Sequence, residues 1–208
     1  MNIFDLVLLF SVVVVLLGLV GILLSLVTRR WMMLRRFSWG LVSFLGVYAL
    51  VLASVSLFSP QRVLAMREVR CFDDWCLSVE RVEKQPAIGA AQAHGDFYLV
   101  TLQVSNRARG IRQRANEVAV YLIDERGVRI DPSPEGEQAL AEAGLAGRPL
   151  TTMMEVGGGF EHTAVFDIPR EITQLDLITD HGAFPGRIII GSDQSWLHKQ
   201  TIVHLSMP

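Results

Sequence analysis

Charged side chains are almost missing from two long stretches at the start of the sequence. The stretch 3–27 contains one acid, Asp5, and no Lys or Arg, while the stretch 37–58 contains no charge at all. A core helix of a soluble protein seldom continues past about twenty residues without a polar face. At about 1.5 Å of rise per residue, each stretch is long enough to cross a hydrocarbon layer of about 30 Å. The lack of charge therefore predicts two transmembrane helices, at 3–28 and 37–58, rather than a pair of buried core helices.

The N-terminus also lacks the basic residues that open a secretory signal peptide. The first five residues, MNIFD, carry an acid and no Lys or Arg, and the apolar run ends in Thr28-Arg29-Arg30. A signal peptide has a basic start, a shorter apolar run and a small-residue cleavage site. We therefore expect the first run to be retained as a membrane span.

Basic residues separate the two apolar runs. The short connection at 29–36 has no acid and contains four arginines: Arg29, Arg30, Arg35 and Arg36. The positive-inside rule places such a loop in the cytoplasm and both ends of the chain outside. Arg62, Arg67 and Arg70 follow the second run and pull the other way. We expect the four-arginine loop to set the topology of a bacterial inner or plasma membrane protein, with its C-terminal domain extracytoplasmic.

Cysteine is nearly absent, since Cys71 and Cys76 are the only two. No second cysteine pair and no His-x-His partner accompanies them, which argues against a metal site, and their spacing does not fit a C-x-x-C redox motif. In an oxidising compartment, two cysteines five residues apart can close a small loop. We predict a disulfide, with two unpaired thiols as the alternative.

The rest of the chain has the composition of a soluble domain. Residues 59–208 carry 15 Lys and Arg, which is the total of 19 less the four loop arginines, against 20 acids, which is the total of 21 less Asp5. This net charge of −5 is not the basic footprint of a nucleic-acid-binding protein. We expect a connector at 59–70 that is neither Gly/Ser-rich nor long, followed by one domain at 71–208.

The pattern of this domain is mostly period two, which is typical of short strands separated by turns. The predicted strands lie at 75–82, 96–105, 117–123, 128–130, 160–168, 175–179, 187–190 and 201–205. One stretch differs, because Ser133 and Pro134 provide an N-cap and a first helical residue, and Gly144 provides a stop. The predicted fold is a transmembrane α-hairpin followed by an all-β, immunoglobulin-like sandwich with one short helical insertion.

Three motifs carry a resemblance to a known family. They are Val104-Ser105-Asn106, the turn that ends in Asp124-Glu125-Arg126-Gly127, and Val165-Phe166-Asp167-Ile168-Pro169. Their order over residues 76–180 resembles the telokin-like, immunoglobulin-like family of bacterial surface domains. The resemblance implies an extracytoplasmic, anchored or secreted domain of unknown biochemical role, and its motifs specify strands and turns rather than chemistry. Two spans depart from the lipoprotein signal or single span that is usual there, and residues 181–208 have no place in the pattern.

No catalytic constellation is present in the sequence. The five histidines are scattered without metal-binding spacing, and no G-x-S-x-G motif surrounds a serine. Gly157-Gly158-Gly159 has neither the strand-to-helix unit nor the Lys of a phosphate-binding loop, so a hairpin turn is expected. We expect no catalytic residue, no metal ligand and no cofactor.

Two segments are candidates for binding. The loop 106–116 holds four arginines, Arg107, Arg109, Arg112 and Arg114, which can grip anionic lipid heads or an acidic partner. The alternative is an ordinary solvated loop. The segment 181–205 contains Phe184, Trp196 and Leu197, which form either an exposed aromatic patch or a cap over the open end of the sandwich.

These observations favour a non-catalytic, membrane-anchored protein that docks a protein partner or assists an envelope complex. The partners expected are the lipid bilayer and an unknown protein, and not nucleic acid. The alternative is a ligand-sensing extracytoplasmic module that signals through its helical hairpin to a membrane partner. Against sensing, only about ten residues are expected on the cytoplasmic side.

Overall fold

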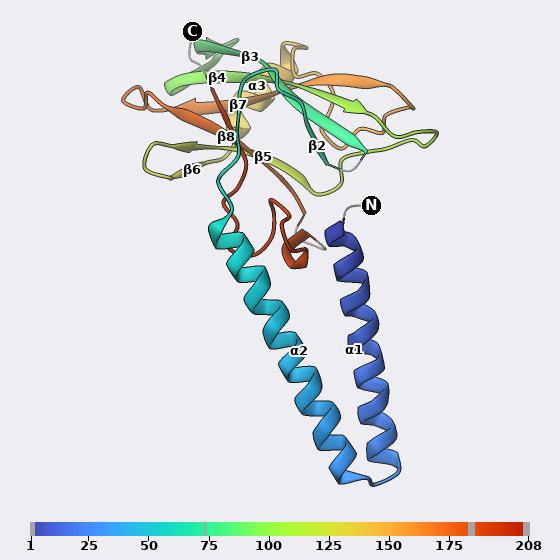
Figure 1. Cartoon of the computed structure of the whole chain (residues 1–208). Helices are drawn as coiled ribbons and strands as arrows, with labels where there is room; N and C mark the ends of the chain where they lie inside the picture. The colour runs from blue at the N-terminus through green and yellow to red at the C-terminus, as the bar shows by residue number, and fades with distance from the viewer. Residues whose placement is uncertain (1–2, 73, 183–185, 206–208) are drawn as a thin grey trace. The chain divides into compact units, whose positions relative to one another are not determined.

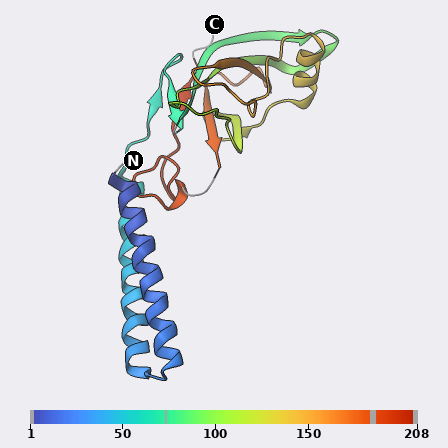
Figure 2. The same cartoon turned by 90° about the vertical axis from the view of Figure 1, so that its right-hand side faces the viewer.

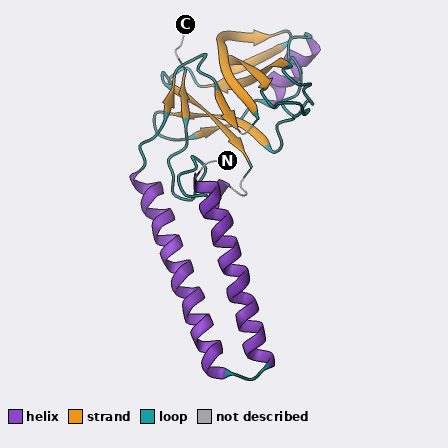
Figure 3. Cartoon of the chain, turned by 45° about the vertical axis from the view of Figure 1, so that its right-hand side comes forward, coloured by secondary structure: helices purple, strands orange, loops and turns teal. Residues whose placement is uncertain are grey.

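The computed structural model describes residues 3–72, 74–182 and 186–205. The chain forms two compact units. Unit 1 contains Met1–Gln61 and Ala183–Gln200, and unit 2 contains Arg62–Gly182 and Thr201–Pro208. In Figure 3, the two long purple helices belong to unit 1, whereas the orange strands and one short purple helix belong to unit 2. The chain therefore passes from unit 2 back to unit 1 once before its last strand.

Unit 1 is built on a helical hairpin of α1 (Ile3–Val27) and α2 (Trp31–Phe58). Both helices are long and apolar enough to cross a membrane, with mean hydropathies of 3.2 and 2.3 in their most apolar windows. Their apolar side chains are mostly exposed within the unit, as at Leu17, which is 65% exposed. The helices approach closely where Gly18 faces Leu41 and Gly21 faces Phe37. Little of their apolar surface is covered by the chain itself.

The turn between the helices is tighter than the sequence predicted. Arg29 adopts a left-handed conformation with φ of 50°, and the backbone nitrogen of Arg30 donates to the carbonyl oxygen of Ser25. The second helix then begins at Trp31, so Arg35 and Arg36 lie in α2 rather than in a loop at 29–36. No Pro or Gly stands between Arg30 and Phe37 to delay the helix. All four arginines still lie at the closed end of the hairpin.

Residues 186–200 also belong to unit 1. The strand predicted at 187–190 is wrong, because the segment forms a 3₁₀ turn, η1 (Gly186–Ile188). Its backbone closes on itself when the nitrogen of Ile189 donates to the carbonyl oxygen of Gly186, and Gly191 reverses the chain with φ of 77°. The segment therefore groups with the helices in unit 1, whereas the sequence left a cap over the sandwich and an exposed aromatic patch as alternatives. Phe184, part of that expectation, lies outside the described residues.

Unit 2 is a β-sandwich of two sheets. In the first sheet (Figure 1) the order is β1 (Val63–Leu64), β9 (Ile202–His204), β8 (Leu175–His181), β5 (Val118–Asp124) and β6 (Arg129–Ile130). In the second it is β2 (Arg70–Phe72), β3 (Trp75–Ile88), β4 (Ala91–Asn106) and β7 (Gly159–Ile168). Neighbouring strands are antiparallel, except that β1 and β9 are parallel.

The main core lies between the two sheets. Val79, Leu102 and Phe166 contribute from the second sheet and Leu122 and Leu177 from the first, and all five are fully buried. These side chains alternate along their strands with polar or outer-face residues, as the period-two pattern predicted. The strands predicted near β5, β6, β7, β8 and β9 agree with the structure to within one or two residues.

The β3–β4 hairpin is longer than predicted, because it extends to Ile88 and resumes at Ala91. Its register shifts between Gln85 and Ala87, so Pro86 sits at an irregularity where a missing N–H is tolerated. The helix predicted after Ser133 is present as α3 (Pro134–Glu142), and the Ser133 side chain caps it by accepting from the nitrogen of Gly136. Figure 2 shows α3 beside this end of the hairpin.

A small second core joins α3 to the second sheet. Leu140 of α3 packs with Ile88, Phe97, Leu99 and Val165. The boundary of unit 2 also differs from the prediction, because β1 and the start of β2 lie within the stretch expected to be a connector at 59–70. Val63 and Leu64 become a strand only through pairing with Ile202 and Val203, almost 140 residues later.

Candidate functional site

The arginine-rich loop that follows β4 is held in shape by one buried amide, that of Asn106. Asn106 is 2% exposed, and its Nδ2 donates to the carbonyl oxygens of Ile111, Met154 and Glu155 at 3.0–3.3 Å. Its Oδ1 accepts from the backbone nitrogen of Ala108 at 2.8 Å. A single side chain thus ties the start of the loop to its tip and to the residues before β7.

The other end of the loop is fastened by Gln113. Its backbone pairs with that of Met154 in both directions, at 3.1 and 2.7 Å, and its Nε2 donates to Oδ2 of Asp74 at 3.3 Å. The backbone nitrogen of Arg107 donates to the carbonyl oxygen of Asp74 at 2.7 Å. Because both ends are tied to neighbouring segments, the loop has a defined shape before any partner binds.

The four arginine side chains of the loop lie at the surface. Arg107, Arg109, Arg112 and Arg114 are exposed. Arg112 pairs with Glu155 at 2.8 Å, but both side chains are more than 60% exposed, so the pair contributes little to stability. Within the described residues, no carboxylate lies within ion-pair distance of the other three arginines. Ile111, at the tip beside Gly110, is 54% exposed.

The loop concentrates positive charge in a negative domain. It holds four arginines and no acid, whereas the other residues of 59–208 carry 11 basic side chains against 20 acids, a net of −9. An acidic surface that approaches the loop is therefore attracted by it and repelled by most of the rest. The arrangement is suited to binding a carboxylate- or phosphate-bearing surface, since each guanidinium can donate two parallel hydrogen bonds.

The two cysteines lie on a different part of unit 2. Cys71 of β2 and Cys76 of β3 are directly opposed in the sheet, and their sulfurs are bonded. On the neighbouring pair, Phe72 stacks on Trp75 with ring centroids 4.5 Å apart, and His181 lies 4.1 Å from Phe72. The disulfide and the aromatic stack hold β2 in place, which is a structural role.

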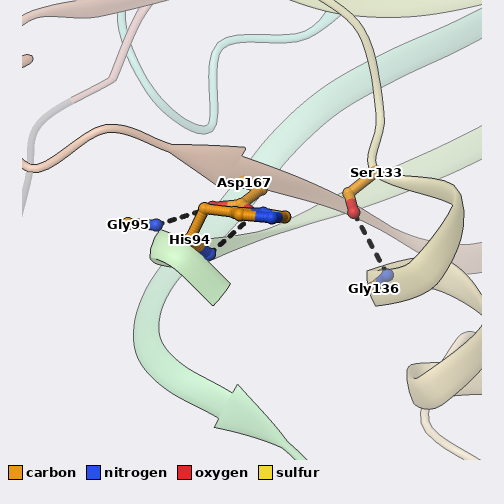
Figure 4. A network of polar contacts seen from close by, with 5 residues as sticks. All are labelled: His94, Gly95, Ser133, Gly136 and Asp167. Carbon is orange, nitrogen blue, oxygen red and sulfur yellow. Dashed lines mark hydrogen bonds and ion pairs between the residues drawn. The ribbon is translucent and has the colours of Figure 1, made fainter. Parts of the chain in front are cut away.

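A second polar cluster lies where β4 and β7 run side by side, and Figure 4 shows its centre. Oδ2 of Asp167 accepts from the backbone nitrogen of His94 at 2.9 Å and lies 2.8 Å from Nδ1 of its ring, while Oδ1 accepts from the nitrogen of Gly95. Nearby, Asp96 pairs with Lys84 at 3.1 Å and lies 3.6 Å from Arg170. An open cleft of about 480 Å³ adjoins the cluster.

This cluster perturbs the pKa values of its members. The hydrogen bond with Asp167 raises the pKa of His94. For Asp167, burial acts to raise the pKa, but hydrogen bonds from the backbone of His94 and Gly95 outweigh it and lower the pKa. In the described part of the chain, the His94 ring has no hydrogen bond to a hydroxyl or thiol. The pair joins β4 to β7 beside the end of their ladder, where Asp96 is opposite Ile168.

The polar residues of the three family-like motifs share one role. Asn106, Asp124 and Asp167 each bind backbone N–H groups at a turn or strand end. Asp124 is almost fully buried and accepts from the nitrogens of Arg126 and Val128, and these bonds, led by that from Val128, lower its pKa. Asn106 and Asp124 thus stabilise turns, and Asp167 joins two strands.

Groups suited to metal binding are missing from the described residues, where no three His, Cys, Asp or Glu side chains gather. The histidines have separate neighbours: His204 lies 2.8 Å from Asp176, and the ring of His162 lies 3.0 Å from the carbonyl oxygen of Arg148. The sequence did not reveal the His94–Asp167 pair, because its members are 73 residues apart and no local signal links them.

Comparison with known proteins yields no family. No family profile and no curated protein matches the sequence. Three solved structures show partial likeness. A conserved hypothetical protein from Bacillus anthracis has a TM-score of 0.46 and 16% identity, covering 56% of this chain and 89% of that one. The yjhA protein from Bacillus subtilis has a TM-score of 0.43 and 14% identity, covering 69% and 99%. An uncharacterized β-sandwich protein from Clostridium difficile 630 has a TM-score of 0.43 and 7% identity, covering 71% and 96%. No functional argument rests on these likenesses.

Proposed function

We propose that this chain is a non-catalytic membrane protein whose β-sandwich lies outside the cytoplasm and docks an acidic protein surface through the loop 107–114. The observation that carries the proposal is the loop itself. Asn106 and Gln113 fix the loop backbone in advance, and the four arginines that it carries are exposed. Three of the four form no ion pair among the described residues. Exposed arginines that only increased solubility would not require a loop backbone fixed by buried hydrogen bonds.

Membrane anchoring is supported by the surface of the helical hairpin. Side chains such as Leu17, Leu24 and Leu50 are left 60–69% exposed by the described residues, and a hydrocarbon phase is a favourable environment for such apolar surface. Arg29, Arg30, Arg35 and Arg36 gather at the closed end, which the positive-inside rule assigns to the cytoplasm. The sandwich then follows the outer end of α2.

A protein partner fits the loop better than a lipid surface does. Ile111 projects at the tip, flanked by Gly110 and Arg112, so the loop offers an apolar contact surrounded by guanidiniums. Arginine beside a buried apolar anchor is a frequent composition of the energetically important centre of protein interfaces. The surrounding net negative charge of the domain would repel an extended anionic membrane, whereas a local acidic patch would meet only the loop.

The telokin-like, immunoglobulin-like relationship is part of the same proposal. It is supported by the places of the three motifs, at the end of β4, in the turn after β5 and at the end of β7. Domains of this architecture commonly act through loops and edges, which agrees with a docking role for a loop at the end of β4.

The docking proposal is tested with the full-length protein in nanodiscs of zwitterionic lipid. The probe is a fluorescent peptide rich in Glu and Asp, and binding is followed by anisotropy at low and high salt. In the test variant Arg107, Arg109 and Arg114 become Gln. The matched control replaces Arg62, Arg81 and Arg170, which removes the same charge from exposed sites with acidic neighbours.

We expect salt-sensitive binding of the probe by the wild type and the control, and affinity lower by on the order of tenfold in the test variant. Equal binding by the test variant would overturn the docking site. Preferential binding of the loop to phosphatidylglycerol vesicles over the peptide would replace the protein partner by a lipid.

Topology is tested with single cysteines and an impermeant maleimide on intact cells. Glu125→Cys, in the exposed turn after β5, should react from outside, whereas Thr28→Cys, at the closed end of the hairpin, should react only after permeabilisation. The reverse pattern would place the sandwich in the cytoplasm.

A further inference from the structure

Residues 186–200 are bonded to the second helix at two levels. The hydroxyl of Tyr48 donates to the carbonyl oxygen of Ile188 at 2.7 Å, and the hydroxyls of Ser56 and Ser195 are 2.8 Å apart. The other helix takes part as well, because Gly191 lies against the ring of Phe4, near the start of α1. Figure 1 shows the segment between the open ends of α1 and α2.

The segment also closes upon itself. The nitrogen of Trp196 donates to the carbonyl oxygen of Arg187 at 3.0 Å, which brings the two ends of the loop together, and the nitrogen of His198 donates to the carbonyl oxygen of Ser195 at 2.9 Å. Ile190, within the loop, is only 6% exposed. The segment is therefore a compact loop whose ends lie close together, with a defined outer surface, rather than an extended connection.

Its outer surface presents two large apolar side chains. Trp196 is 68% exposed and Leu197 is 49% exposed, although the preceding residue, Ser195, is 3% exposed and is bonded to the fully buried Ser56. Leu197 adopts a left-handed conformation with φ of 69°, which a leucine rarely takes. Exposure of Trp196 and Leu197 to water is unfavourable because both side chains are large and apolar, and the backbone of Leu197 is strained as well.

The inference rests on the proposed membrane anchoring, under which the places of Tyr48 and Ser56 along α2 give the depth of Trp196 and Leu197 in the bilayer. From Arg36 to Ser56 the helix advances twenty residues, or about 30 Å, which is the thickness of a bilayer's hydrocarbon core. Arginines near the inner boundary extend toward the headgroups, which shifts the outer boundary toward Tyr48. The outer boundary therefore falls between Tyr48 and Ser56, the two residues that hold the segment.

We propose that Trp196 and Leu197 form an anchor in the outer interfacial layer of the membrane. The occupant of this surface is the boundary between lipid headgroups and acyl chains, where tryptophan is favoured because its ring is apolar and its N–H is a donor. The segment is thereby a second membrane attachment of the extracytoplasmic part, separate from the helical spans and from the arginine loop.

The test uses the full-length protein in liposomes and takes advantage of the cysteine pair, since an engineered cysteine is then the single free thiol among the described residues. A polarity-sensitive fluorophore is attached in turn at Leu197→Cys, at Glu125→Cys in unit 2 and at Leu17→Cys in the middle of α1. Quenchers are lipids brominated near the headgroup or near the end of the acyl chain. Trp196 stays in place in all three variants.

We expect the label at position 197 to emit at shorter wavelength than that at 125 and to lose most of its fluorescence to the shallow quencher. The label at position 17 should respond to the deep quencher. If the label at position 17 is quenched while the label at position 197 behaves like that at 125, the interfacial anchor is overturned, although the proposed membrane spans are supported. If 17 is not quenched, the proposed anchoring fails and the inference fails with it. Emission from the intrinsic Trp196, compared with that of Trp196→Phe in the same lipids, repeats the test without a label.

Discussion

The carboxylate of Asp167 lies 2.8 Å from Nδ1 of His94 and accepts a hydrogen bond from the backbone nitrogen of the same residue at 2.9 Å. The pair links β4, two residues before its ladder with β7 begins at Asp96, to the end of β7. Because one partner titrates near neutral pH and the other in acid, its contribution to stability is confined to a window of pH.

The pH range in which the pair stabilises the fold follows from the pKa shifts of His94 and Asp167. The pKa of His94 is raised by its bond to Asp167, so that contribution is complete below the unfolded value of about 6.5 and is lost as the pH rises through the higher folded value. The pKa of Asp167 is lowered, so its contribution is present above about 3.9 and is lost as the pH falls through the lower folded value.

We therefore expect His94→Gln to lower the melting temperature most between about pH 4.5 and 6 and least near pH 8. The comparison must be between variant and wild type, because burial lowers the pKa of His162 and gives that residue the opposite pH dependence in both proteins. Thermal melts across this range measure it, and a difference independent of pH would contradict the ion pair.

Asn106→Ala should loosen the arginine loop. It removes the donor to three carbonyl oxygens and the acceptor of the Ala108 nitrogen, leaving partly buried polar groups without partners at a cost of about 1–3 kcal/mol. Urea unfolding gives the stability, and amide exchange of residues 107–113 reports the loop. Asn116→Ala, at an exposed position of the same loop, is the matched control and should change neither.

Loss of the disulfide should destabilise unit 2 moderately. The closed loop at 71–76 is short, so chain-entropy arguments give about 2 kcal/mol for the double change of Cys71 and Cys76 to Ala. Unfolding in urea measures the loss, and the mass of the unreduced protein should be two hydrogens below that of the reduced one. Alkylation of both cysteines without reductant would show instead that the thiols are free.

Gly136→Ala, in the first turn of α3, has two opposite effects on the free energy of unfolding. Helix propensity favours alanine by about 1 kcal/mol. A Cβ at this position, however, would lie 2.6 Å from Cγ1 of Val165 and 3.2 Å from the Phe97 ring, and such overpacking costs about 1–3 kcal/mol. We expect packing to prevail and the melting temperature to fall. A rise would mean that Val165 can move aside.

Patterns within a few residues were sufficient for much of the fold. The lack of charge marked α1 and α2, period two marked most strands, and Ser133, Pro134 and Gly144 marked α3, because each feature depends on neighbours in the sequence. The opposed cysteines were also suggested by their short separation. The two-residue β1 was not, since it exists only by pairing with β9.

The candidate sites divide in the same way. The four arginines of the loop were evident from their spacing, but the framework beneath them was not, because Asn106 and Gln113 act through Met154 and Glu155 across 40 or more residues. Trp196 and Leu197 were noticed as an aromatic patch and assigned to the sandwich. The contacts to Tyr48 and Ser56, more than 130 residues earlier, and the approach of Gly191 to Phe4 place the segment with the helices.

The chain leaves the sandwich after β8, joins unit 1 at residues 186–200 and returns to the sandwich at β9. This path affects how proteases could release the sandwich from the helices. A protease that cuts between α2 and β1 severs one connection, but the sandwich remains joined through the segment that Tyr48 and Ser56 hold. A cut after β8 leaves the connection after α2 intact. The chain crosses between the two units three times, so shedding of the domain from its helices requires a cleavage at all three crossings, or one cleavage after α2 and the extraction of that segment.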